Sequence, residues 1–323
     1  MKILILGGTK FVGRYITEAL LSAGHTVTLF NRGQTNDGLF SNVERLTGNR
    51  DGGLDALKGK TWDAVIDVSG FLPRVVRDSA ELLRSQVGHY VFISSISVYA
   101  DMSQPITEDS PLVEWDDPQA ELSNESYAGL KVWCERAVQN VYAAQACIVR
   151  PAFVLGPHDT TYRYPYWLWR AGRGGRMLVP AEDDMTSGVD ARDLGAFVER
   201  LTADGAAGIY NVHQPVSLLE SIQLAIELSG ADTQVIALPA AKANEQELFG
   251  GKLPLWLAGN ELAGIRVSRS VRAEQAGLRF RPLRETVADT LAWIANEEAR
   301  DTWPTGLSQN EEQSLLSEIE NSK

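Results

Sequence analysis

The sequence of 323 residues contains few side chains that could bind a structural metal or form disulfides. Its two cysteines, Cys134 and Cys147, show neither a metal-binding spacing nor a disulfide framework, and its four histidines are scattered along the chain. These absences predict a chain without a structural metal that works in a reducing compartment, which we take to be the cytoplasm.

Positive charge is also scarce, since 30 Lys and Arg residues face 42 Asp and Glu residues and the formal net charge is -12. Nucleic acids and anionic membranes bind broad cationic surfaces, so neither is expected as a main partner. Long apolar runs are missing as well: the run Met1 to Leu6 stops at Gly7, too short for a secretion signal or a membrane span, and fits a buried strand better. A small-molecule substrate is the expected partner.

The sequence has instead a regular alternation of apolar runs and helical periodicity. Strands are predicted at 2–6, 25–30, 62–68, 89–94 and 146–149, and helices at 11–23, 74–86 and 126–144. This order predicts an α/β fold with a Rossmann-type, doubly wound parallel sheet that helices cover on both faces.

The character of the sequence changes after Pro151, where aromatic residues gather at 162–169 and three glycines and three arginines follow at 170–176. We expect a core over 1–156 to which 186–213 returns, and a smaller C-terminal substrate lobe from 157–185 and 214–300. Helices are predicted at 191–201, 218–228 and 284–298, and strands at 209–212 and 235–238. The tail 301–323 is predicted as a short helix or a partly disordered segment.

The glycine turn Gly7–Gly13 lies where the first strand must turn into the first helix. Glycines let a pyrophosphate approach the backbone, and the helix N-terminus offers it free N–H groups; a plain tight turn is the alternative. The second strand ends in Asn31 and Arg32, without the acid that would accept a ribose 2′-hydroxyl. Because Arg32 could pair with a 2′-phosphate and Lys10 adds a second charge, NADP(H) is favoured, and NAD(H) stays an alternative.

Tyr127 and Lys131 are four residues apart and so share one face of a helix. A neighbouring ammonium favours the phenolate, so we expect Lys131 to lower the pKa of Tyr127 and to hold the nicotinamide ribose while Tyr127 exchanges a proton with an alcohol or carbonyl. The segment Phe92–Tyr99 ends the preceding strand with several hydroxyls, and Ser95 could donate to the substrate oxygen. Otherwise Ser95 simply closes a turn, and the Tyr/Lys pair lies on a solvated helix face.

At this point the chain resembles the extended short-chain dehydrogenase/reductase family, the NAD(P)-dependent epimerase/dehydratase group. The resemblance spans about residues 1–300 and rests on five motifs in order: GGTKFVG, FISSISVY, YAGLK, RPAFVLGPHD and VDARDL. It implies Ser95, Tyr127 and Lys131 as the catalytic triad. It also implies cofactor contacts from Gly7, Thr9, Lys10, Phe11, Val12, Gly13, Asn31, Arg32, Asn49, Arg50, Val68, Ser69, Gly70, Tyr127, Lys131, Pro151 and Val154, and it suggests that Pro151 to Val154 pass the nicotinamide end.

Several residues depart from that family pattern. Lys10 replaces a glycine of the fingerprint, and Asn49 stands where an acid is usual near the adenine, with Asp51 close by. The residues after Ser95 include no acid, so a dehydratase would lack its general acid. Three consecutive acids at 182–184 stand where an arginine usually meets a sugar-nucleotide diphosphate, and they would repel it.

The substrate is therefore expected to differ from an ordinary sugar nucleotide. Candidate substrate-binding residues are Ser97, Tyr99, Arg163 and Trp167, although at least half of the aromatic run is expected to be lobe core. Arg170, Arg173, Arg176 and Arg266 are further candidate anion ligands, with simple solvation as the alternative.

The function predicted from these residues is an NADP(H)-dependent oxidoreductase or epimerase acting on an alcohol or carbonyl carbon. One alternative is a nucleotide-sugar epimerase or dehydratase with tightly bound NAD. Another is a dinucleotide-sensing or RNA-associated binding protein, because the atypical turn looks similar to that of chloroplast RNA-binding proteins. Whether the reaction is a net redox step or an epimerisation stays open, as does a homodimer.

Overall fold

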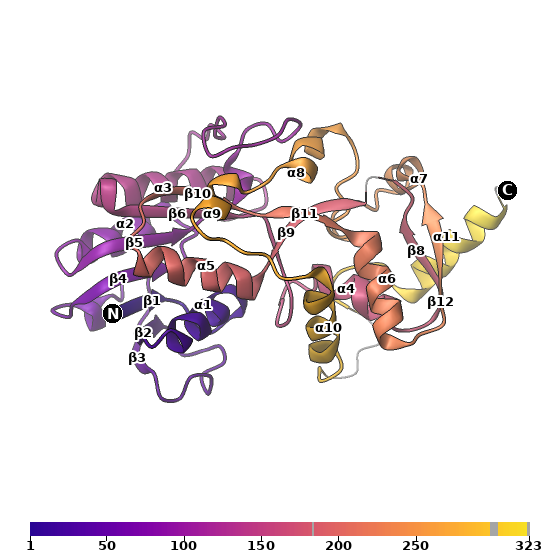
Figure 1. Cartoon of the computed structure of the whole chain (residues 1–323). Coiled ribbons are helices and arrows are strands. Elements are labelled where there is room, and N and C mark those ends of the chain that lie inside the picture. The colour runs from indigo at the N-terminus through magenta and orange to yellow at the C-terminus, as the bar shows by residue number, and fades with distance from the viewer. Residues whose placement is uncertain (183, 298–302, 322–323) are drawn as a thin grey trace.

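The structure is a computed structural model that describes residues 1–182, 184–297 and 303–321. Figure 1 shows a sheet with helices on both faces at the N-terminal side and a smaller lobe at the other side, where the chain ends. The predicted fold class is confirmed, because the central sheet is parallel throughout and has seven strands in the described residues.

The order of the central sheet is β10-β6-β5-β4-β1-β2-β3. Its direction of winding reverses between β1 and β4, so a crevice opens beyond the carboxyl ends of these two strands, where ligands bind in such sheets. The strands are β1 (Lys2–Leu6), β2 (Thr26–Asn31), β3 (Glu44–Thr47), β4 (Trp62–Asp67), β5 (Val87–Ile93), β6 (Ala146–Pro151) and β10 (Gly208–Val212).

Side chains of β1 alternate between two hydrophobic cores, as the period of a strand requires. Ile3 and Ile5 pack with α1 (Phe11–Ser22) and α5 (Ala191–Ala203) on one face. Leu4 and Leu6 pack with α2 (Pro73–Leu83) and α3 (Tyr127–Tyr142) on the other. The helices α1 and α5 contact each other on the first face, and α2 and α3 contact each other on the second. Helices therefore cover both faces of the sheet.

The C-terminal lobe has its own core and two small sheets. One sheet has the order β11-β9-β7, and the other pairs β12 with β8. The strands are β7 (Phe153–Leu155), β8 (Gly175–Pro180), β9 (Met185–Asp190), β11 (Gln214–Ser217) and β12 (Thr233–Leu238). The remaining helices are α4 (Arg163–Ala171), α6 (Leu218–Ser229), α7 (Ala240–Glu245), α8 (Ala263–Val267), α9 (Val271–Gln275), α10 (Leu283–Ile294) and α11 (Gln309–Asn321), and short 3-10 turns are η1 (Asp55–Leu57), η2 (Ile96–Val98), η3 (Ala143–Gln145) and η4 (Asn260–Leu262).

The tail forms α11, the helical one of the two predicted alternatives, and its Leu315 and Leu316 pack into the lobe core. The lobe differs from the sequence prediction in two places. Ala273 and Leu278, predicted to lie in the lobe, pack against the α1/α5 face of the central sheet. The helix predicted at 284–298 ends at Ile294, and residue 298 of that prediction lies outside the described residues, as do residues 299–302 and 322–323 of the predicted lobe and tail.

No helix in the described ranges combines the length and the apolar character that crossing a bilayer requires.

Candidate active site

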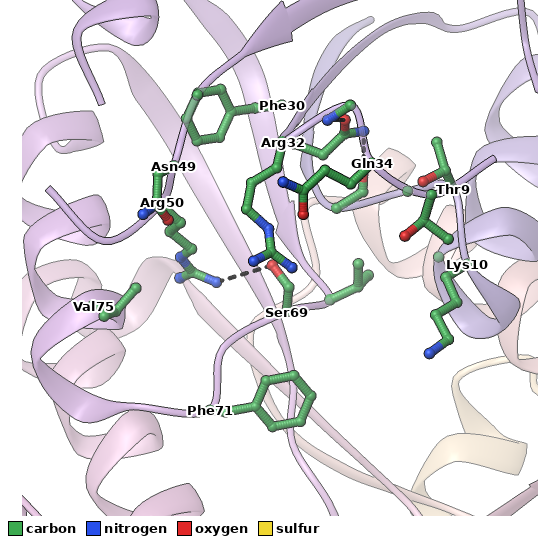
Figure 2. Close-up of a pocket in the computed structure, with 18 of the residues that line it drawn as sticks. Thr9, Lys10, Phe30, Arg32, Gln34, Asn49, Arg50, Ser69, Phe71 and Val75 are labelled. Carbon is green, nitrogen blue, oxygen red and sulfur yellow. Dashed lines mark hydrogen bonds between the residues drawn. The ribbon is translucent and has the colours of Figure 1, made fainter. Parts of the chain in front are cut away.

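A cavity of about 670 Å³ lies beyond the carboxyl ends of β1, β2 and β4. Figure 2 shows side chains from the glycine turn, from the end of β2 and from the segment after β4 around it. Many predicted cofactor residues line it: Gly7, Thr9, Lys10, Phe11, Val12, Gly13, Asn31, Arg32, Asn49, Arg50, Val68 and Ser69. Gln34, Thr35, Phe71, Leu72, Val75, Leu122 and Thr160 also line it, and no motif in the sequence marked them.

The glycine turn has a shape that larger residues could not adopt. Gly7 has a φ of +116°, and a Cβ on it would lie 2.6 Å from a methyl carbon of Val68. A Cβ on Gly13 would lie 2.9 Å from the backbone nitrogen of Gly8. The hydroxyl of Thr17 fixes the turn by donating to the carbonyls of Gly8 and Gly13. The backbone at the start of α1 is therefore open to the cavity, as a phosphate site requires.

Two cations face the cavity next to this turn. Asn31 fixes the end of β2, since its Nδ2 donates to Gly7 O at 3.1 Å and its Oδ1 accepts from Gly33 N at 2.9 Å. Arg32 directly follows Asn31, and Lys10 belongs to the glycine turn. Both residues are exposed, and Figure 2 shows their side chains at the cavity. Within the described ranges neither has a carboxylate at ion-pair distance. Their charges are available to an anion.

Arg50 also lines the cavity, but its charge is already neutralised. Its guanidinium forms a two-bond ion pair with the buried Asp67 and donates to Ser69 Oγ at 3.3 Å. Burial alone would lower the pKa of Arg50, but the Asp67 carboxylate raises it above its usual value. Asp51, the acid near the adenine position, pairs with Arg74 on α2. Arg50 is thus a fixed part of the cavity wall. Asp51 is paired with Arg74 and does not present a free carboxylate to a ribose.

Ser95 and Tyr127 meet at the carboxyl end of β5. Ser95 begins the η2 turn, and its Oγ accepts from Ser97 N at 3.2 Å and from Ser97 Oγ at 2.8 Å. Tyr127 is the first residue of α3. Burial raises the pKa of Tyr127, while a hydrogen bond with Ser95 and the charge of Arg163 lower it, and the net direction is upward.

Lys131 differs from its expected role in the pair. Its Nζ donates to Gly70 O and Ile93 O, both at 2.9 Å, and lies 4.8 Å from the ring centroid of Phe71. Lys131 is not among the groups that act on the pKa of Tyr127, so the expected lowering of that pKa by Lys131 is wrong. Burial instead lowers the pKa of Lys131 itself to about 8. Gly70 contributes its carbonyl to this contact rather than lining the cavity.

Pro151 and Val154, predicted to pass the nicotinamide end, do not line the cavity. Pro151 is the buried last residue of β6 and pairs with Val212 of β10. Val154 is half-buried in β7 and packs against the α1/α5 face. Their contact with a nicotinamide stays a prediction.

The predicted substrate contacts of Tyr99 and Trp167 are wrong, because both side chains are buried. The Tyr99 side chain is buried; its hydroxyl donates to Asn211 Oδ1 at 2.7 Å and accepts from Arg150 Nη1 at 2.9 Å. Trp167 is buried within the lobe core, and its Nε1 donates to Pro254 O at 2.6 Å. Both side chains are satisfied inside the protein, so neither presents a surface to a substrate. The aromatic run of α4 is largely core, as expected for at least half of it.

The acids expected to repel a diphosphate hold parts of the lobe together. Glu182 accepts from Ala240 N at the start of α7, and Asp184 accepts from Ser217 Oγ and Leu219 N at the start of α6. Asp183 lies outside the described residues. Glu182 and Asp184 therefore act as helix caps, a role that sequence position alone did not indicate.

A buried ion pair that no motif in the sequence indicates lies behind the site. Arg150 Nε donates to Glu135 Oε1 at 2.9 Å and Nη2 to Glu135 Oε2 at 2.5 Å, with both side chains almost fully buried. Glu135 lies four residues after Lys131 on α3, so helix spacing could have indicated a shared face. The pair fixes α3 against β6 behind the candidate catalytic residues.

The described part of the chain brings no three His, Cys, Asp or Glu side chains together as a metal site, and both cysteines are free and buried.

The chain is similar to proteins that are already known. The model of the NAD dependent epimerase/dehydratase family matches residues 3–212. Among curated proteins, the chain is 27% identical over 220 residues to the chloroplast stem-loop binding protein of 41 kDa b of Arabidopsis thaliana. That alignment covers 62% of this chain and 53% of the relative, so the chain matches about half of the relative's length.

Solved structures share the fold over nearly the whole chain. UDP-glucose 4-epimerase from Bifidobacterium longum, in complex with NAD+ and UDP, matches with a TM-score of 0.66 at 18% identity, covering 92% of this chain and 99% of that one. UDP-glucuronic acid 4-epimerase from Bacillus cereus, in complex with NAD, matches with a TM-score of 0.65 at 15% identity, covering 91% and 96%. At these identities the likeness establishes the fold.

Proposed function

Because the chain belongs to the NAD dependent epimerase/dehydratase family, we propose that it is an NADP(H)-dependent oxidoreductase or epimerase acting on an alcohol or carbonyl carbon of a small molecule. The observation that carries the proposal is that Ser95 and Tyr127 lie close together at the carboxyl end of β5, where Lys131 contacts Phe71 at the wall of the cavity. The nicotinamide, when bound, supplies or accepts the hydride.

The chain's own residues handle the proton. Because the pKa of Tyr127 lies above its usual value, its phenol keeps its proton at neutral pH and can donate it to a carbonyl oxygen as hydride arrives. Ser95 lies beside that phenol, and its hydroxyl can donate to the same oxygen as negative charge develops there. Lys131, fixed by two carbonyls beside the cavity, is proposed to donate its remaining N–H to the nicotinamide ribose.

We base the proposed choice of cofactor on Arg32 and Lys10, which have no carboxylate at ion-pair distance among the described residues. An adenosine 2′-phosphate is a dianion that Arg32 can bind through two parallel N–H bonds, with Lys10 as a second charge. Arg50 is held by Asp67 and contributes little net charge. These residues favour NADP(H) over NAD(H), whereas the solved epimerases named above contain NAD.

Titration of the purified protein with NADPH and NADH tests this choice. We expect wild type to prefer NADPH, and Arg32→Ala to bind NADPH about 10- to 100-fold more weakly with NADH nearly unchanged, because a charge-assisted hydrogen bond contributes about 1.5–3 kcal/mol. Arg77→Ala is the matched control, since Arg77 is an exposed arginine paired with Asp78 on α2. Tighter binding of NADH by wild type would refute the preference.

Tyr127→Phe tests the chemistry. NADPH consumption is followed at 340 nm with a panel of small aldehydes and ketones, and any ligand that co-purifies is identified by mass spectrometry. We expect the variant to bind NADPH like wild type and to lose turnover by about 100-fold or more. Turnover equal to that of wild type would remove Tyr127 from the mechanism.

Two alternatives keep specific support. The solved neighbours include epimerases of UDP sugars, so one-to-one binding of UDP together with NAD retained through purification would favour a nucleotide-sugar epimerase. The curated relative is named for stem-loop binding, so salt-sensitive binding of a stem-loop RNA would favour a binding protein. The net charge of -12 argues against the second outcome.

A further inference from the structure

Arg163 stands at the junction between the central sheet and the lobe. It is the first residue of α4, and its guanidinium carbon lies 4.9 Å from the ring centroid of Phe153. Phe153 packs both against the lobe core and against a small cluster that includes Ile96 and Val98, which directly follow Ser95. The ring therefore holds the guanidinium near the turn that carries the candidate catalytic serine.

The charge of Arg163 reaches the reacting phenol. Burial raises the pKa of Tyr127 and of the buried Asp159, and the Arg163 charge acts on both in the opposite direction. Thr160, three residues before Arg163, lines the cofactor cavity. The guanidinium thus lies within electrostatic range of Tyr127, and its segment borders the cavity.

Most hydrogen-bonding capacity of Arg163 is uncommitted. Its Nε donates to Thr161 Oγ1 at 3.1 Å, and among the residues that the structure describes no carboxylate lies within ion-pair distance of the guanidinium. Asp159, the acid whose charge it affects, accepts from the backbone and hydroxyl of Thr161 instead. Arg170, on the same helix, is by contrast paired with Glu312. The two terminal nitrogens of Arg163 form a fork with the geometry that carboxylates and phosphates bind.

We propose that Arg163 binds an anionic group of the substrate, a carboxylate or a phosphate monoester, a few bonds from the carbon whose oxygen Tyr127 protonates. This rests on the proposed function. The substrate class is then a small hydroxy or oxo acid, or a phosphate ester of a small alcohol or ketone. The cofactor's own phosphates have the glycine turn and the Arg32/Lys10 cations, so Arg163 is left for the second ligand.

The test uses the full chain saturated with NADPH, so that the cofactor's phosphate sites are filled. Malonate and inorganic phosphate are titrated in separate calorimetric experiments into wild type, Arg163→Gln and Arg173→Gln. Arg173 is the matched control: it lies just beyond the other end of α4, and its guanidinium carbon lies 4.8 Å from the ring centroid of Trp169. The Kd of NADPH is measured for each variant first.

We expect at least one anion to bind wild type and Arg173→Gln equally, and Arg163→Gln about tenfold or more weakly, with the Kd of NADPH unchanged. Binding of malonate alone would identify the substrate as a hydroxy or oxo acid, and binding of phosphate alone would identify it as a phosphate ester. Binding of both would show that the site accepts either anionic group. No binding of either anion to wild type, or equal binding to Arg163→Gln, would overturn the proposal. A tenfold loss of NADPH affinity in Arg163→Gln would also overturn it, by making Arg163 a cofactor ligand. Failure of wild type to bind either dinucleotide would instead refute the proposed function.

Discussion

Replacing Lys131 by methionine should change how the stability of the protein depends on pH. Lys131 is 3% exposed, and burial lowers the pKa of its ammonium from 10.5 to about 8. Methionine has a similar volume and no charge, so Lys131→Met removes this titration from the folded protein and from the unfolded chain. The difference in free energy of unfolding between wild type and variant then isolates the titration of Lys131.

The sign follows from where the proton is bound. Between pH 8 and 10.5 the unfolded chain keeps the Lys131 proton while the folded protein has released it, so the free energy of unfolding of wild type rises with pH. A shift of about 2.5 pKa units corresponds to about 3 kcal/mol. Wild type should therefore gain about 3 kcal/mol relative to Lys131→Met between pH 7 and 10.5. The carbonyls of Gly70 and Ile93 lose a donor in the variant, which shifts the difference by a constant amount at every pH.

Urea unfolding of both proteins at pH 7, 8, 9 and 10.5, followed by circular dichroism, measures the difference. A difference that stays flat within about 1 kcal/mol over this range would show that the pKa of Lys131 is close to its usual value, and would refute the reasoning. A gain near the expected size would also mean that about nine in ten Lys131 side chains are charged at pH 7. That charge is what its proposed contact with a nicotinamide ribose requires.

The central fold could be predicted from the sequence because its signals are local. The run Lys2–Leu6, the glycine turn and the periodic segment after it predict β1, the turn and α1, and the structure has all three at nearly the predicted bounds. Parallel strands buried on both faces are apolar throughout, and helices that cover them repeat every three or four residues. The family motifs lie at the ends of these elements, which explains why the predicted residues of the turn meet in one cavity.

The lobe was predicted less completely because its strands carry weaker signals. β9 reads Met185–Asp190, with Thr, Ser and Gly inside, and is buried through its pairing with β7 and β11 rather than by apolar side chains. The sequence of α4 shows a cluster of aromatic residues without a periodicity that predicts a helix or a strand. Whether such a segment forms a strand depends on partner strands that are distant in the sequence, and the local pattern of apolar residues does not indicate those partners.

Individual side-chain roles were the least predictable part of the site. The spacing of Tyr127 and Lys131 indicates one helix face. The ammonium of Lys131 nevertheless donates to the carbonyls of Gly70, in the loop after β4, and Ile93, at the end of β5, because a buried charge needs acceptors. Trp167 belongs to the same aromatic run as the half-buried Trp169, and which of the two is core depends on the packing of α6 and α10. The contacts of Lys131 and the burial of Trp167 therefore both depend on residues that are neighbours only in the folded structure.

Two substitutions probe the supports of the site. Gly7→Ala should lower the free energy of unfolding by about 1–3 kcal/mol and abolish NADPH binding, because its φ of +116° and the close approach of Val68 exclude a Cβ. Gly24→Ala is the control: Gly24 has a φ of +80° and open space around it, so this variant should lose less stability and bind NADPH like wild type in the same NADPH titration. Glu135→Gln should lower the free energy of unfolding by about 3–5 kcal/mol, since it leaves the Arg150 guanidinium buried without its counter-charge. A urea midpoint within error of wild type would mean that water or a rearranged neighbour compensates the Arg150 charge, and that the pair does not fix α3 against β6.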